Sequence, residues 1–143
     1  MLRMEQYLHF RQVDTFSAHT IEIDTIGRNG EPMDDSDARL VERTLDILGG
    51  KWKVLILWHL GVAGVCRFGE LRHKLPGVTQ RTLTLQLREL EAAGLVHRTV
   101  YAEVPPRTEY RQTEEAKDLA AVYMELKRWS LAHRELLRER ESR

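Results

Sequence analysis

The spacing of apolar residues along the chain predicts a mainly helical protein. Leu40, Val41, Leu45 and Leu48 recur at intervals of three and four residues, which places them on one face of a helix. Leu83, Leu87 and Leu90 repeat this pattern further along, as does a longer stretch near the end of the chain. The predicted helices cover residues 34–48, 51–61, 67–75, 79–93 and 113–140.

Turn and cap residues delimit these elements. Asp and Ser residues precede the first helix, Thr79 and Thr113 are suited to cap two later ones, and Gly94 ends the helix before it. The sequence LVHRTVYAEV alternates as a strand, a rigid Pro-Pro loop follows, and RTEYRQT predicts a returning strand. A helix-turn-helix followed directly by a two-stranded hairpin is a winged helix in outline.

We therefore expect an α+β fold, mainly α with a small β-hairpin wing. The expected divisions are an extension at residues 1–33 with one candidate strand in HTIEIDTIG, a winged helix-turn-helix domain at 34–113 and a C-terminal helix at 114–143. No apolar run reaches the length of a membrane span and the first residues carry charges, so we expect a cytoplasmic protein with no membrane partner.

The net charge of zero conceals a segregation of charge. Residues 1–38 hold 3 basic and 8 acidic side chains, whereas residues 39–111 hold 12 basic and 7 acidic ones. A neutral protein is a poor candidate for binding nucleic acid, but a basic middle segment weakens that objection.

The helix that begins after Thr79 carries side chains suited to reading DNA. With the leucines inward, its outward positions are Gln80, Arg81, Thr84, Leu85 and Arg88. Arginine and glutamine can pair with base edges in the major groove, whereas threonine and leucine can contact a thymine methyl group. Further expected contacts with DNA, mainly to phosphate, are Lys51, Arg72, Lys74, Thr79 and Arg107. The alternative is an ordinary solvated helix face.

Several motifs in order resemble those of HxlR-type winged-helix transcriptional regulators: GGKW, RFGEL, LPGV, LTLQLRELE and EVPPRTEY. The resemblance covers residues 39–129 and implies a bacterial homodimer that binds a pseudo-palindromic operator. It also implies that residues 34–113 form the DNA-binding domain and that residues 114–143 form the helix through which the protein dimerises. The residues expected at the dimer interface are Leu119, Val122, Tyr123, Leu126, Trp129, His133 and Leu136. The alternative is that this face packs on its own domain.

Two positions depart from the family pattern. Members that sense oxidants carry a cysteine where this chain has Arg39, so that thiol chemistry cannot operate here. Leu85 stands where the family commonly has a polar residue, often glutamine, which puts a hydrophobic contact on the outward face.

Other chemistry has little support in the sequence. Cys66 is a candidate redox thiol, because Arg67 and the start of the predicted helix that follows could lower its pKa. The alternative is that it serves as a small hydrophobic side chain. The histidines show no metal-ligand spacing and no catalytic motif is present, so we expect no metal, no cofactor and no enzyme activity. Trp52 and Trp58 are candidates to line a cavity for an unidentified small-molecule effector. The rival function is a winged-helix module that binds protein instead of DNA.

Overall fold

A computed structural model describes residues 34–141, with side chains up to residue 138. Residues 34–46 belong to one compact unit and residues 47–141 to a second. The predicted strand near residues 19–27 lies outside the described residues. Along 34–141 no helix combines the length and the apolar character needed to cross a bilayer.

Helix α1 spans Asp35–Leu48. Its residues up to Asp46 belong to the first unit, and its last two residues belong to the second. Asp34 caps it, because its carboxylate accepts hydrogen bonds from the backbone N–H groups of Ser36 (2.7 Å) and Asp37 (3.2 Å). The predicted apolar stripe is present, but Leu40, Val41 and Leu45 are all more than half exposed. Along residues 34–46 the apolar stripe of this helix is therefore exposed.

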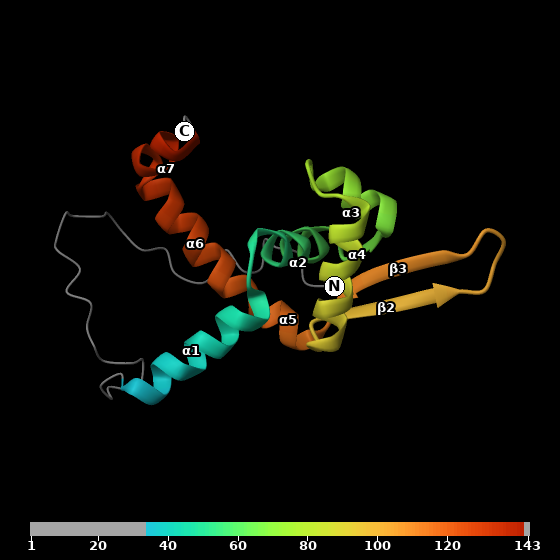
Figure 1. Cartoon of the computed structure of the whole chain (residues 1–143), viewed down its shortest axis with the longest axis horizontal. Coiled ribbons are helices and arrows are strands. Elements are labelled where there is room, and N and C mark those ends of the chain that lie inside the picture. Colours follow the sequence, from blue (N-terminus) through green and yellow to red (C-terminus); the bar gives the residue numbers. More distant parts are fainter. Residues whose placement is uncertain (1–33, 142–143) are drawn as a thin grey trace. The chain divides into compact units, whose positions relative to one another are not determined.

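Three helices form the helix-turn-helix of the second unit: α2 (Lys51–Ala63), α3 (Phe68–Lys74) and α4 (Gln80–Ala92). The three helices are labelled in Figure 1. Their inward leucines and isoleucine form much of the core. Helix α2 was expected to end at Gly61 but continues to Ala63, and Gly64 ends it with a positive φ of 79°. The most deeply buried side chains are Ile56, Leu57, Leu60, Leu71, Leu75, Leu83, Leu87 and Leu90.

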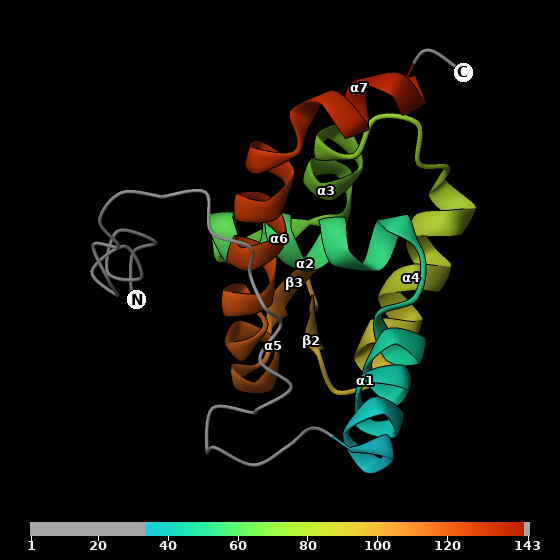
Figure 2. The same cartoon turned by 90° about the vertical axis from the view of Figure 1, so that its left-hand side faces the viewer.

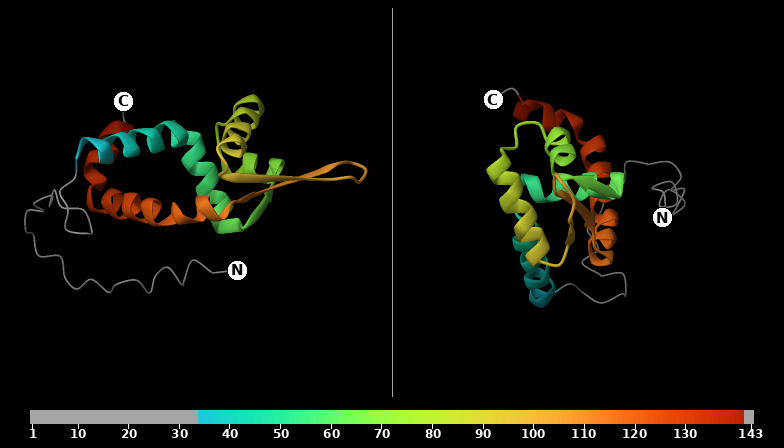
Figure 3. Two further views of the ribbon diagram at one scale, coloured as in Figure 1. Left: turned by 90° about the horizontal axis from the view of Figure 1, so that it is seen from below. Right: turned by 90° about the vertical axis from the view of Figure 1, so that its right-hand side faces the viewer.

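The sheet has three strands where the sequence analysis expected a two-stranded hairpin. They are β1 (Val65–Arg67), β2 (Val96–Tyr101) and β3 (Arg107–Gln112), in the order β1-β3-β2 and all antiparallel. Residues 65–67, at the end of the segment VAGVCR, form β1, in which Cys66 pairs with Tyr110 of β3. We call residues 96–112 the wing; it projects away from the helices on the side opposite α6 (Figure 3).

The C-terminal segment is not the single helix that the sequence predicted. It consists of α5 (Glu114–Asp118), α6 (Ala120–Ala132) and α7 (Arg134–Glu141), as Figure 2 shows. Leu119 interrupts it with a ψ of −11°, and His133 interrupts it again with φ −121° and ψ 38°. The His133 ring stacks on Trp129 at 4.6 Å between centroids. The predicted fold class, a mainly helical winged helix with a small sheet, is confirmed.

Candidate DNA-binding surface

Helix α4 is held firmly at its start and along its inner face. Thr79 caps it, with its hydroxyl oxygen accepting from the backbone N–H of Thr82 at 3.1 Å. Leu83, Leu87 and Leu90 are each no more than 2% exposed. The predicted cap and the predicted inward face are both confirmed, so the orientation of the outward face is fixed by packing.

The outward face of α4 is open to solvent. Gln80, Arg81, Leu85 and Arg88 are exposed, and Thr84 is half-buried. The Thr84 hydroxyl donates to the Gln80 carbonyl at 2.8 Å, within the helix. The helix therefore presents amide, guanidinium and aliphatic groups in its first three turns, while its threonine hydroxyls serve the helix itself.

Four cationic side chains on α3 and α4 are free of ion pairs within the described part of the chain. Within residues 34–138, no carboxylate lies at ion-pair distance from Arg72, Lys74, Arg81 or Arg88. In contrast, Lys117 and Arg128 on the C-terminal helices pair with neighbouring glutamates at 2.6 and 2.8 Å. Unpaired cations on adjoining helices give a positive surface that suits a phosphate backbone.

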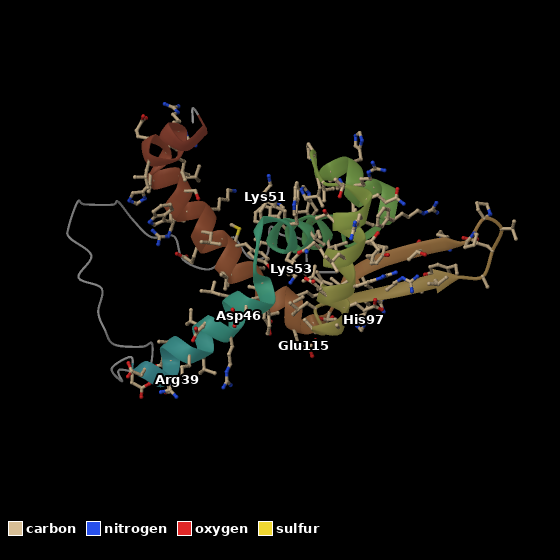
Figure 4. All side chains as sticks on the ribbon, in the orientation of Figure 1. Arg39, Asp46, Lys51, Lys53, His97 and Glu115 are labelled. Atoms are coloured by element: carbon tan, nitrogen blue, oxygen red, sulfur yellow. The ribbon has the colours of Figure 1, made fainter. Side chains whose placement is uncertain are left out.

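Lys51 and Lys53 lie in the first turn of α2 and make different contacts (Figure 4). Lys51 is exposed, with its ammonium 4.5 Å from the centre of the Trp52 ring. The Lys53 ammonium lies 2.7 Å from Glu89 Oε2 on α4, and its side chain is only 12% exposed. The contact of Lys51 with phosphate remains a prediction, whereas the ion pair of Lys53 with Glu89 links α2 to α4.

Arg107 at the start of β3 is already engaged within the wing. Its Nε lies 2.6 Å from Glu103 Oε1, without hydrogen-bond geometry, and its Nη1 lies 3.1 Å from Glu109 Oε1. The guanidinium also covers the Tyr101 ring at 4.0 Å. A phosphate would have to compete with two carboxylates for this side chain, so the predicted contact of Arg107 with DNA stays a prediction.

Cys66 lacks the environment that its predicted redox role required. The thiol is 1% exposed on β1, and burial, together with the charge of Glu70, raises its pKa. A raised pKa lowers the thiolate fraction and with it the reactivity. Arg39, which the resemblance places where oxidant-sensing members carry a cysteine, is exposed on α1 (Figure 4).

The residues expected at a dimer interface divide into two groups. Tyr123 is 5% exposed and belongs to the core, where it meets Trp58 edge-on at 6.4 Å between ring centroids. Leu119 is partly buried against the same core. The others, which remain exposed, are Val122 at 48%, Leu126 at 55%, Trp129 at 45% and Leu136 at 53%, with exposed His133 beside them. Tyr123 therefore packs within the core of its own chain.

Sequence reasoning missed the contacts that join distant segments. The Lys53–Glu89 pair and the hydrogen bond from Gln112 Nε2 to the Leu57 carbonyl (2.8 Å) have no local signature. Across residues 34–141 no three His, Cys, Asp or Glu side chains come together as metal ligands.

This arrangement, a capped and exposed helix beside unpaired cations and a projecting wing, defines a winged-helix DNA-binding protein. The family model described as HxlR-like helix-turn-helix matches residues 47–137. The chain belongs to this family, and the relatives it matches are transcriptional regulators.

Two relatives from Bacillus subtilis strain 168 illustrate the similarity. The HTH-type transcriptional regulator YybR is 50% identical over 97 residues, which are 68% of this chain and 77% of that protein. YdeP, another regulator of this type, is 52% identical over 96 residues, which are 67% of this chain and 74% of that protein. Among solved structures, the redox regulator HypR in its reduced form matches with a TM-score of 0.65 and 48% identity, covering 70% of this chain and 98% of that one.

Proposed function

We propose that the protein is a homodimeric transcriptional regulator that binds a pseudo-palindromic operator in the cytoplasm, with α4 of each subunit in the major groove. The observation that carries the proposal is the outward face of α4, where Arg81 and Arg88 are exposed and have no acidic partner among residues 34–138. The N-terminal residues of such a helix reach base edges when it enters the groove. Arg81, in its first turn, would read a guanine through O6 and N7.

The flanking cations would supply affinity without sequence preference. Arg72 and Lys74 on α3 are exposed, and so is Lys51 at the start of α2. Contacts from such side chains to phosphate release counterions, so binding weakens steeply as salt rises. In this proposal Thr79 and Thr84 orient α4, and Arg107 contributes less than the cations of α3.

Dimerisation is proposed on the exposed apolar side chains of α6 and α7. Val122, Leu126, Trp129 and Leu136 leave apolar surface open along these helices. Burying that surface against a second copy would stabilise the dimer through the hydrophobic effect. Two copies related by a two-fold axis would present two α4 helices to half-sites about one helical turn apart, roughly 34–36 Å.

The test is selection of bound duplexes from a random pool, followed by fluorescence-anisotropy titration of the enriched sequence at two salt concentrations. The proposal expects a palindromic enriched sequence that binds more tightly than a scrambled duplex, with affinity falling steeply with salt. Equal, weak binding to both duplexes would favour the rival function, a module that binds protein.

A further inference from the structure

Leu85 is an apolar side chain in the middle of an otherwise polar, cationic helix face. It lies four residues after Arg81 and three before Arg88, so all three share the outward face of α4. Its side chain is 51% exposed, whereas the inward leucines of the same helix are at most 2% exposed. Leu85 therefore belongs to the surface that α4 presents and not to the core.

The hydroxyl groups of the neighbouring threonines are already used by the helix. Thr84 donates to the Gln80 carbonyl at 2.8 Å, and Thr79 contacts both the backbone N–H and the hydroxyl of Thr82, at 3.1 and 2.9 Å. Among the large apolar side chains of α4, Leu85 is the one that is exposed.

The major groove has one apolar feature that such a side chain can recognise. Thymine carries a 5-methyl group there, and aliphatic side chains contact it directly. Arg81 and Arg88 beside Leu85 are cationic and exposed, which complements the negative charge of duplex DNA. A bound duplex would shield the exposed leucine from water. Because only thymine carries the methyl group, this contact would favour duplexes that have a thymine at that position.

We propose that Leu85 is a specificity-determining residue that packs on the 5-methyl group of one thymine in each half-site. This inference rests on the proposed function, because it requires α4 to lie in the major groove. Four residues of helix rise about 6 Å, and base pairs stack about 3.4 Å apart. The thymine therefore lies within about two base pairs of the base that Arg81 reads.

The experiment uses the full-length protein and the palindromic duplex enriched from the random pool. Each thymine is replaced in turn by deoxyuridine, which pairs identically but lacks the 5-methyl group, symmetrically in both half-sites. Anisotropy titrations compare the wild type, Leu85→Ala, Leu85→Gln and the control Val62→Ala, which shortens a 57% exposed side chain on α2. Thermal unfolding verifies that each variant is folded.

We expect one thymine position at which deoxyuridine weakens wild-type binding about fourfold per half-site, the factor that burial of one methyl group supplies. Leu85→Ala and Leu85→Gln should each bind the thymine duplex and the duplex with deoxyuridine at that position with equal affinity. Val62→Ala should behave as the wild type.

Three results would overturn the inference. If no thymine is sensitive, or if the sensitivity persists in both Leu85 variants, Leu85 does not read a methyl group although the protein still binds an operator. If the pool yields no enriched sequence, the proposed function itself fails and the role of Leu85 fails with it.

Discussion

The ammonium of Lys53 lies 2.7 Å from Glu89 Oε2 and so joins the first turn of α2 to the last turns of α4. The lysine side chain is 12% exposed and the glutamate 44%. The pair is therefore partly shielded from water. An ion pair that is shielded from water is stronger than one that is fully exposed. Together with the buried leucines of α4, the ion pair fixes how α4 packs against α2.

A double-mutant cycle should detect this pair. Lys53→Gln and Glu89→Gln should each lower the free energy of unfolding, with a coupling of about 0.5–1 kcal/mol, at the upper end of exposed pairs. Urea unfolding at low salt measures it. The matched control is Lys117 with Glu114, a pair 2.6 Å apart whose side chains are 51% and 85% exposed. Equal coupling in the two cycles would contradict a special role for Lys53.

Arg72 and Arg107 should differ in their effect on the salt dependence of operator binding. Arg72 is exposed without an acidic partner among residues 34–138, whereas Arg107 is held by Glu103 and Glu109. Loss of one phosphate contact makes the negative slope of log K against log salt shallower by about 0.9 per subunit. We expect Arg72→Ala to approach that value and Arg107→Ala to fall clearly short of it, as anisotropy over a salt series would measure. A larger change for Arg107→Ala would show that the wing releases its arginine to DNA.

Tyr123 should make the protein sensitive to alkaline pH. Burial raises its pKa from the ordinary value of 10.0 to about 12, and among residues 34–138 its hydroxyl has no hydrogen-bond partner. The unfolded chain therefore loses this proton first, so stability from the neutral phenol is complete below pH 10 and falls as the pH rises toward 12.

Tyr123→Phe removes the hydroxyl and keeps the ring against Trp58. We expect stability at pH 7 to be unchanged or higher, because an unpaired buried hydroxyl is costly. The extra loss between pH 10 and 12 should disappear in urea unfolding followed by circular dichroism. An unchanged alkaline loss in Tyr123→Phe would show that another group is responsible.

Leu126→Glu should dissociate the proposed dimer without unfolding the subunit. Leu126 is 55% exposed, so the substitution leaves the core intact but would bury a charge at the interface. Sedimentation velocity should give a monomer, and operator affinity should fall at least tenfold. Val62→Glu, on an exposed residue of α2, is the control and should remain dimeric. A dimeric Leu126→Glu would place the interface elsewhere.

Features fixed by local chemistry were predictable from the sequence. The caps at Thr79 and Thr113, the end of α4 near Gly94 and the inward leucines of α4 all follow from turn chemistry and helical spacing. The fold class and the outward residues of α4 followed from these elements.

Features that depend on distant contacts were not predictable. Strand β1 exists because residues 65–67 meet residues 109–111, and a three-residue strand has no period to read. The apolar spacing of the C-terminal segment continues through Leu119 and His133, so it conceals both breaks. Tyr123 shares the helical spacing of the exposed residues, yet packing against α2 buries it.

The most direct test of the account is the specificity ratio of Arg81→Ala, the Kd for scrambled duplex divided by the Kd for the enriched operator. Lys117→Ala is the charge-matched control, since Lys117 lies on α5 and pairs with Glu114. Loss of a bidentate base contact costs about 1–3 kcal/mol, so the ratio should fall by at least fivefold in Arg81→Ala and stay constant in the control. An unchanged ratio in Arg81→Ala would contradict the assignment of α4 as the helix that reads DNA through Arg81.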